Sequence, residues 1–172
     1  MTHTVHPYAH RLGIIRDWKS RWFAGHKKNF RENLLVDASI RKSLLKKLHG
    51  MHVADIEIER SATEIRVILH TARPGLVIGR SGENATKLRK APTHNRTVKL
   101  DIVEIRQPET NAMVVAQMVA EGLEKRLPFR RVLKGTIEKV MAVREVIGVR
   151  VVISGRLGGA DMSRTEQLKK GR

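Results

Sequence analysis

The first half of the chain shows one helical and several strand-like patterns of apolar residues. From Asn29 to Leu48 the apolar positions recur at helical intervals, and Gly50 follows as a natural stop. Residues 54–59 and 64–70 alternate apolar and polar side chains, which predicts two strands joined as a hairpin. Val98 to Arg106 shows the same alternation. The pattern therefore predicts an α+β unit built from a helix, two strands, a loop with a second helix, and a third strand.

The second half of the chain is predicted to begin with two packed helices. Gln107-Pro108-Glu109 marks the boundary, because proline cannot continue a strand ladder and suits the start of a helix. The apolar residues between Ala112 and Leu127 share one helical face, and those between Phe129 and Met141 share another. Residues 149–154 alternate as a strand. We expect a second α/β domain with two helices and a sheet.

The strand predicted at residues 149–154 has no obvious partner. A lone strand leaves both edges unpaired, and the sequence ends soon afterwards in Lys169-Lys170-Gly171-Arg172. We therefore expect the given chain to be incomplete at its C-terminal end. The alternative is that the tail from Ser163 returns as a partner strand, although Glu166 to Arg172 is polar for a strand.

The N-terminal segment carries no sustained hydrophobic period. Met1 to Gly25 mixes His, Arg, Trp and Pro, which predicts an extended basic arm. Trp18 and Trp22 lie four residues apart. We expect both indoles to anchor the arm by packing, with base stacking as the less favoured alternative.

Charge changes this picture by pointing to a polyanionic partner. The chain holds 34 Lys plus Arg against 17 Asp plus Glu, which gives a formal net charge of +17 and a pI near 11.1. Such a surplus favours binding to nucleic acid through counterion release. Aromatic residues make up only 3% of the chain, so burial depends on Leu, Ile and Val, and RNA recognition by base stacking on a sheet is disfavoured.

The residues from Pro74 to Lys90, PGLVIGRSGENATKLRK, carry the candidate chemistry. Gly79 and Gly82 are three apart, so that no side chain at these two positions blocks the approach of sugar and phosphate. A helix starting near Glu83 would point free N–H groups at the same phosphates. This arrangement is typical of the clamp of KH modules. The candidate RNA-binding residues are Arg73, Gly79, Arg80, Ser81, Gly82, Lys87, Arg89 and Lys90.

Other chemistries do not fit the sequence. Arg80 follows Gly79 where a Walker A loop needs Lys and then Ser or Thr, and no dinucleotide-binding glycine spacing occurs. Cysteine is absent and the eight histidines show no paired metal spacing, so we expect no metal, no cofactor and no enzymatic activity. Without a signal sequence or a membrane-spanning apolar run, we expect a cytoplasmic location and no membrane partner.

Five segments in order carry a family resemblance: VHPYAHRLGI, HTARPGLVIGRSGE, RQPETNA, LEKRLPFRRVLK and VISGRLGGADMSRTE. Through them the chain resembles the bacterial-type small-subunit ribosomal protein number three. The resemblance implies a basic arm at residues 1–28, a type II KH RNA-binding domain at 29–107, and the family's C-terminal α/β domain at 108–172. It further implies a place in the head of the small subunit, bound to 16S-type rRNA and to small-subunit proteins ten and fourteen, with no homo-oligomer.

The resemblance also implies a contact with mRNA where it enters the ribosome. The family's mRNA-unwinding residues are matched by Arg130, Arg131 and Lys134, and spacings of three and four place these cations on one side of a helix. The mechanism would be an electrostatic grip without nucleotide hydrolysis. The remaining candidate rRNA contacts are the cations of the arm and tail: His6, Arg11, Lys19, Arg21, Arg156 and Arg164.

The chain departs from the family pattern at two places, and two alternative functions stay open. The segment between Leu88 and Val98 is shorter than in relatives, and Gly135 stands where relatives often have a basic residue, which weakens the expected mRNA patch. A free-standing KH regulator of transient transcripts would share the same charge and loop. A nuclease using Asp161 and Glu166 is the weaker alternative, since solvated charge explains both residues.

Overall fold

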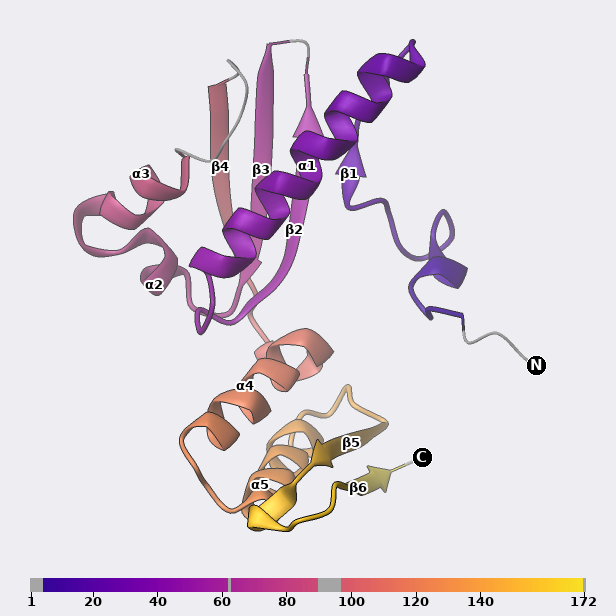
Figure 1. Ribbon diagram of the computed structural model, residues 1–172, viewed down its shortest axis with the longest axis vertical. Helices are drawn as coiled ribbons and strands as arrows, with labels where there is room; N and C mark the ends of the chain where they lie inside the picture. The colour runs from indigo at the N-terminus through magenta and orange to yellow at the C-terminus, as the bar shows by residue number, and fades with distance from the viewer. Residues whose placement is uncertain (1–4, 62, 90–96, 172) are drawn as a thin grey trace. The chain divides into compact units, whose positions relative to one another are not determined.

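The chain folds into two compact units, each of which is described by itself. The structure is a computed structural model that describes residues 5–61, 63–89 and 97–171 (Figure 1). The first unit holds Met1–Lys47, Asp55–His70 and Gly75–Val103, and the second holds Leu48–Ala54, Thr71–Pro74 and Glu104–Arg172. The α+β class expected from the sequence is confirmed. The domain ranges 1–28, 29–107 and 108–172 remain predictions.

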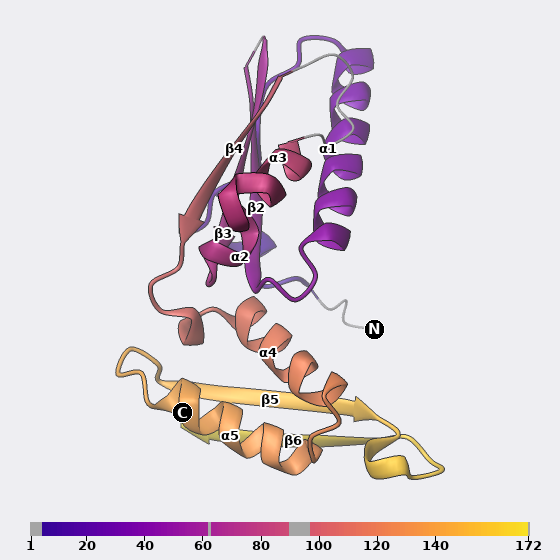
Figure 2. The same cartoon turned by 90° about the vertical axis from the view of Figure 1, so that its left-hand side faces the viewer.

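The first unit is a four-stranded sheet with helices on one face. The strands are β1 (Ser20–Arg21), β2 (Val53–Arg60), β3 (Glu64–Thr71) and β4 (Thr97–Glu104), in the spatial order β1-β2-β3-β4. The helices are α1 (Lys27–Lys47), α2 (Pro74–Ile78) and α3 (Glu83–Arg89). Figure 2 views the sheet nearly edge-on and shows the helices on the same side, which leaves the opposite face open.

The predicted alternation of the strands explains how the core of this unit forms. Ile56 and Ile58 of β2 and Ile65, Val67 and Leu69 of β3 are at most 4% exposed. They lie on the helix-covered face together with Ile40 and Leu44 of α1, which are also buried. Each fully buried branched side chain contributes about 1.5–3 kcal/mol by leaving water.

One buried ion pair ties α1 to the sheet. Arg60 pairs with Asp37, and the two side chains are 4% and 3% exposed. The second carboxylate oxygen of Asp37 accepts a hydrogen bond of 2.7 Å from the indole N–H of Trp22. Arg60 also donates to the side-chain oxygen of Asn33 at 3.3 Å. The pair is thus surrounded by donors and acceptors, which a buried charge requires.

The basic arm is more ordered than its sequence predicts. β1 pairs in parallel with β2, with Ser20 opposite Ile58 and Arg21 opposite Glu59. Trp22 anchors the arm through Asp37, as expected, and its ring lies 5.2 Å from that of Phe30. The expectation for Trp18 is wrong, because this residue is 60% exposed. A strand of two residues is too short to show a hydrophobic period in the sequence. β1 is ordered by its pairing with β2.

The stretch before the glycine loop also differs from its prediction. The sequence analysis predicted only a loop and a second helix after strand 64–70, but the short helix α2 lies between that strand and the glycine loop. Pro74 at the first position of α2 fits this, because proline is accepted in the first turn. The predicted loop from Pro92 to Arg96 lies outside the described residues.

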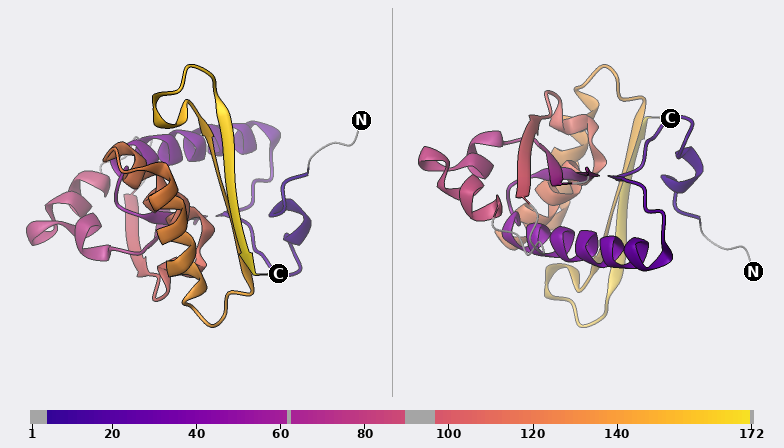
Figure 3. Two further views of the ribbon diagram at one scale, coloured as in Figure 1. Left: turned by 90° about the horizontal axis from the view of Figure 1, so that it is seen from below. Right: turned by 90° about the horizontal axis from the view of Figure 1, so that it is seen from above.

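The second unit contains α4 (Ala112–Glu124), α5 (Phe129–Met141), β5 (Gly148–Gly155) and β6 (Arg164–Gly171) (Figure 3). A 3-10 turn at Pro108–Thr110 precedes α4, and Asn111 caps the helix by accepting a 3.0 Å hydrogen bond from the Met113 amide. The core joins Val119, Leu133 and Ile153. Leu127, predicted on the face of the first helix, lies beyond its end and is 47% exposed.

The polar tail of the chain returns as a partner strand for β5, which the sequence analysis gave as the alternative. β6 pairs antiparallel with β5 over eight residue pairs, from Gly148 with Gly171 to Gly155 with Arg164. Seven of the eight β6 residues are exposed, so apolar burial is not what holds the strand. Backbone hydrogen bonds and cross-strand contacts, such as the 2.6 Å bond from Arg150 to Gln167, stabilise it instead.

A short segment of the second unit contacts α4 through buried polar groups. His52 is 1% exposed, and its Nε2 atom lies 3.2 Å from an oxygen of Glu121. Gln117 donates a 2.8 Å hydrogen bond to the carbonyl of Val53. On the solvent side, the hydrogen bond from Lys125 lowers the pKa of Glu121 below its ordinary value.

Within the described residues, no helix is both long and apolar enough to span a bilayer.

Candidate nucleic-acid interface

The glycine loop has a backbone shape that only glycine adopts at its first position. Gly79 has φ 73° and ψ −179°, a combination reserved for glycine. A Cβ atom there would lie 2.7 Å from the amide nitrogen of Asn84. That amide donates to the carbonyl of Leu76 at 3.3 Å, which ties α3 back to α2. The loop is therefore fixed by local chain geometry.

The second glycine of the loop faces open space. Gly82 has φ 76°, and a Cβ atom at this position would meet no atom of the described chain within 4 Å. Between the two glycines, Arg80 is exposed and starts a 3-10 turn from Arg80 to Gly82. An approaching sugar or phosphate would thus meet main chain at Gly82 and a cation at Arg80.

The cations predicted around the loop are accessible. Arg80, Lys87 and Arg89 are exposed, and among the described residues none of them forms an ion pair. Arg73, just before α2, is exposed too. Lys90 and the side chain of Ser81 lie outside the described part. Because α3 has seven residues and starts with Glu83, we attribute anion affinity here to the side chains and not to the helix end.

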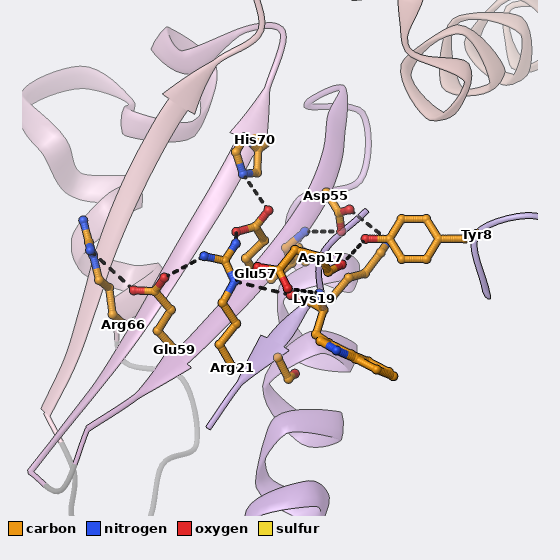
Figure 4. A network of polar contacts seen from close by, with 12 residues as sticks. Tyr8, Asp17, Lys19, Arg21, Asp55, Glu57, Glu59, Arg66 and His70 are labelled. Atoms are coloured by element: carbon orange, nitrogen blue, oxygen red, sulfur yellow. Dashed lines mark hydrogen bonds and ion pairs between the residues drawn. The ribbon is translucent and has the colours of Figure 1, made fainter. Parts of the chain in front are cut away.

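The open face of the sheet holds a network of alternating charges (Figure 4). Lys19 lies 2.9 Å from Asp55, and Arg21 lies 2.6 Å from Glu57 and 3.2 Å from Glu59. Lys19 and Arg21 were predicted as rRNA contacts. The structure places both on acidic side chains of β2, which offset their charge within the domain.

The same network continues across β3 and β4. Arg66 bonds to Asp101 at 2.5 Å, and this carboxylate raises the pKa of Arg66 above its ordinary value. His70 lies 3.3 Å from Glu57. The carboxylates of Asp17, Asp55, Glu57, Glu59 and Asp101 thus accompany the cations of this face. The face is therefore a weaker target for phosphate than the loop.

Two further predicted arm residues lie apart from this network. Arg11 is exposed and donates a 2.8 Å hydrogen bond to the carbonyl of Pro7. The Nδ1 atom of His6 accepts from the amide of Tyr8 at 3.2 Å. Both contacts stay within the arm, so they shape it locally and leave the Arg11 charge accessible.

In the second unit, the predicted mRNA residues gather at the start of α5. Arg130, Arg131 and Lys134 are exposed, and none of them forms an ion pair with another described residue. The guanidinium of Arg130 lies 5.7 Å from the ring centre of Phe129. The guanidinium of Arg164 from β6 lies 5.5 Å from the same ring. Phe129 therefore brings Arg164, predicted as an rRNA contact, beside the predicted mRNA patch.

Phe129 is the residue that the sequence-based site prediction missed. Its signal was present in FRRVLK, where an aromatic residue directly precedes two arginines. Cations over an aromatic face are attracted by its electron density, typically by about 0.5–1 kcal/mol at exposed sites. Phe129 thus lies beside two arginines that are 34 positions apart in the sequence, of which Arg164 also lies 3.7 Å from Glu166.

The residues considered for a nuclease do not form a carboxylate pair. Asp161 lies 3.8 Å from Arg156, and Glu166 lies 3.7 Å from Arg164. Each carboxylate therefore pairs with a different arginine, and Arg156 also donates to the carbonyl of Ala160 at 3.0 Å. Within residues 5–61, 63–89 and 97–171, no group of three His, Asp or Glu side chains is placed to hold a metal ion.

Comparison with known proteins identifies the family. The model of the KH domain matches residues 39–110, and that of ribosomal protein S3, C-terminal domain, matches residues 119–172. The small ribosomal subunit protein uS3 of Caldicellulosiruptor saccharolyticus is 47% identical, with 100% of this chain and 78% of that protein aligned. The proteins of the same name from Clostridium perfringens and Clostridioides difficile are 45% and 46% identical over 99% of this chain, covering 78% and 64% of their own lengths. With this identity over its full length, the chain belongs to the small ribosomal subunit protein uS3 family.

Proposed function

We propose that this chain is a structural constituent of the small ribosomal subunit, where it binds small-subunit rRNA and contacts mRNA at the channel through which mRNA enters. Its membership of the uS3 family supports the ribosomal location. The glycine loop, with Gly79, Arg80 and Gly82, supports RNA binding by the KH domain. The chain acts by binding and not by catalysis, with 16S-type rRNA and neighbouring small-subunit proteins, among them ten and fourteen, as partners.

The observation that carries the mRNA contact is the cationic cluster at the start of α5. Arg130, Arg131 and Lys134 are exposed and without acidic partners in the described chain, whereas the cations of the open sheet face are neutralised. A single strand of RNA carries a phosphate at every nucleotide, so such a cluster holds it by charge. If these three cations hold the single strand where mRNA enters the ribosome, the base pairs of the mRNA ahead of the ribosome are biased toward separation.

The test removes three charges from the cluster. Arg130→Ala, Arg131→Ala and Lys134→Ala together should slow small subunits through a stable mRNA hairpin, and leave an unstructured mRNA unaffected. For the isolated chain, the slope of log affinity for single-stranded RNA against log salt should fall by about 2, since each lost contact removes roughly 0.7. The measurements are ribosome progress on the two messages and a salt titration.

The matched control removes three charges from the same unit at another place. Arg144→Ala, Lys169→Ala and Lys170→Ala alter exposed residues outside the cluster. Subunits carrying this control should pass the hairpin at the original rate. Equal progress of the cluster variant and the control would contradict the mRNA contact, while assembly of both variants into subunits would leave the structural role standing.

A free-standing RNA-binding regulator is the alternative, since the glycine loop and the charge serve either role. It predicts exchange among many transcripts in place of a fixed ratio to small-subunit rRNA. A nuclease is supported by no arrangement in the described residues, because Asp161 and Glu166 pair with separate arginines.

A further inference from the structure

A groove of about 500 Å³ lies between α4 and α5. Met118 of α4 and Val132 of α5 give it apolar walls, and Gly135 opens one side. Arg131 and Lys139 line it as well, and both are exposed. The volume falls within the range of pockets that take small organic groups, about 300–1,000 Å³. The groove lies entirely within the second unit.

In the described part of the chain, neither a close contact nor the backbone conformation requires glycine at position 135. It lies inside α5, where glycine is among the least favourable residues, and its φ is not positive. A Cβ atom added there would meet nothing within 4 Å in the described chain. Gly122 across the groove is different, because its Cβ atom would come within 3.2 Å of Val132. The local consequence of Gly135 is therefore an open groove.

The cations on the rim are spaced along a single helix face. Arg131 and Lys139 precede and follow Gly135 by four residues, which places all three on one side of α5. Eight residues of helix span about 12 Å, a distance that an RNA strand crosses in a few nucleotides. Neither cation forms an ion pair with another described residue. The rim is thus suited to two phosphates on either side of an apolar group.

The inner surface suits a flat ring better than a hydrogen-bonding group. The hydroxyl of Thr136 already donates to the carbonyl of Val132 at 2.7 Å. Glu109 offers an acceptor at the edge of the groove. The thioether of Met118 is a soft partner for an aromatic ring, and the planar guanidinium of Arg131 can stack on a base. These features favour a nucleobase over an aliphatic peptide side chain.

We propose that this groove holds one unstacked base of single-stranded RNA, with neighbouring phosphates on Arg131 and Lys139. The proposal rests on the proposed function, since it extends the cationic cluster of α5 by a base-binding position. It also supplies base contact in a chain with few aromatic residues. Arg131 belongs to both the cluster and the groove, so the strand follows α5 from Arg130 toward Lys139.

The experiment compares two probes on the isolated chain. One is a short fluorescent oligouridylate, and the other is an abasic ribose-phosphate strand of the same length and charge. We expect the oligouridylate to bind several-fold more tightly. Gly135→Leu fills the groove and should remove most of this difference, without changing the salt slope. Gly135→Ala, the matched control, adds a methyl group in open space and should keep the difference.

Two results would overturn the groove proposal. One is equal affinity of the unchanged chain for both probes, and the other is a base-dependent difference that survives Gly135→Leu in full. Should the leucine variant misfold, 4-thiouridine crosslinking of the unchanged chain gives the answer, with crosslinks expected near Met118 and Val132. Crosslinks confined to other segments would contradict the proposal. Binding of an acidic amphipathic peptide, but not of RNA, in the groove would contradict it as well.

Failure of the groove and failure of the mRNA contact are distinguishable. If the cluster variant described above loses affinity for both probes equally while Gly135→Leu has no effect, the charge contact stands and the base site is wrong. If the cluster variant binds both probes as tightly as the unchanged chain, the proposed mRNA contact itself is wrong.

Discussion

Gly79 shows how one residue can determine the shape of a binding loop. Its backbone angles belong to a region that side-chain-bearing residues avoid, and the space where a Cβ atom would stand holds the amide of Asn84. The two constraints act together, because the amide of Asn84 also bonds to Leu76 and closes the loop. The glycine is needed by the loop itself before any RNA approaches.

Replacing Gly79 should therefore weaken RNA binding without touching a charge. We expect Gly79→Ala to lower the affinity for single-stranded RNA about tenfold, which corresponds to about 1.4 kcal/mol, within the cost of a strained residue. Fluorescence anisotropy measures it. Gly75→Ala is the matched control, since Gly75 lies in α2 with open space around it. Equal binding by both variants would show that the loop shape is irrelevant to RNA.

The buried pair of Asp37 and Arg60 sets a second expectation at this scale. Asp37→Ala should lower the free energy of unfolding of the first unit by about 3–5 kcal/mol, because it leaves the Arg60 charge buried without a partner. Urea titration followed by tryptophan fluorescence reports this unit, which contains Trp18 and Trp22. Exposed Glu32→Ala on the same helix is the control.

The pairing can be separated from the loss of packing by a double variant. Asp37→Ala combined with Arg60→Met removes both charges and should recover a large part of the lost stability. A double variant that is less stable than Asp37→Ala alone would argue that the pair acts mainly through other contacts.

Among the elements, β1 depends on its surroundings for its existence. Arg41 of α1 donates to the carbonyl of Lys19 at 2.8 Å, to the hydroxyl of Ser20 at 2.7 Å and to the carbonyl of Ile56 at 2.6 Å. The amide of Ile58 donates to Lys19 at 2.9 Å. One guanidinium therefore joins the arm, α1 and β2, and we infer that it fixes the arm to the domain.

Removing this guanidinium should release the arm. Arg41→Ala should speed hydrogen exchange of the Ile58 amide by at least about tenfold, because that amide bonds to the arm. Buried Val67 in the neighbouring strand should keep its protection. Arg41→Lys keeps the charge but not the planar fork, so it should resemble the alanine variant. Unchanged exchange at Ile58 would mean that the other contacts of the arm, such as those of Trp22 and Arg21, hold it without Arg41.

Elements with their own sequence signal were predictable, and elements that depend on a partner were not. The periodicity of α5 and the alternation of β2 and β3 follow from burial on one face, which a sequence records. In α1, by contrast, Phe30, Leu34 and Leu35 are 51–61% exposed, although they belong to its apolar pattern. β1 has two residues and β6 is polar, so both exist through backbone pairing with a neighbour. Such pairing leaves no trace in composition.

For the whole molecule, the net charge of +17 is not spread evenly over the candidate surfaces. On the open sheet face, Lys19 and Arg21 lie against Asp55, Glu57 and Glu59. At the glycine loop and at the start of α5, Arg80, Arg130 and Arg131 have no such partners in the described chain. Where RNA is proposed to bind, the described cations are therefore accessible, whereas those of the open sheet face are offset by carboxylates.

This distribution decides how much of the site the sequence could predict. The residues of the glycine loop are contiguous in the sequence, so they can be recognised from one stretch of it. The neutralisation of Arg21 depends on Glu57 and Glu59, which lie 36 and 38 positions away, and Phe129 contacts the distant Arg164. Long-range contacts of this kind need the fold. Whether each predicted residue contacts RNA remains a prediction.

The measurement that tests the account most directly is sedimentation of the cellular chain through a sucrose gradient at moderate and at high salt, with each fraction probed for the chain and for small-subunit rRNA. The account predicts that the chain comigrates with small-subunit rRNA in a fixed ratio, and that this comigration survives high salt. Release of the chain into the light fractions together with mixed transcripts would contradict it and favour the free-standing regulator.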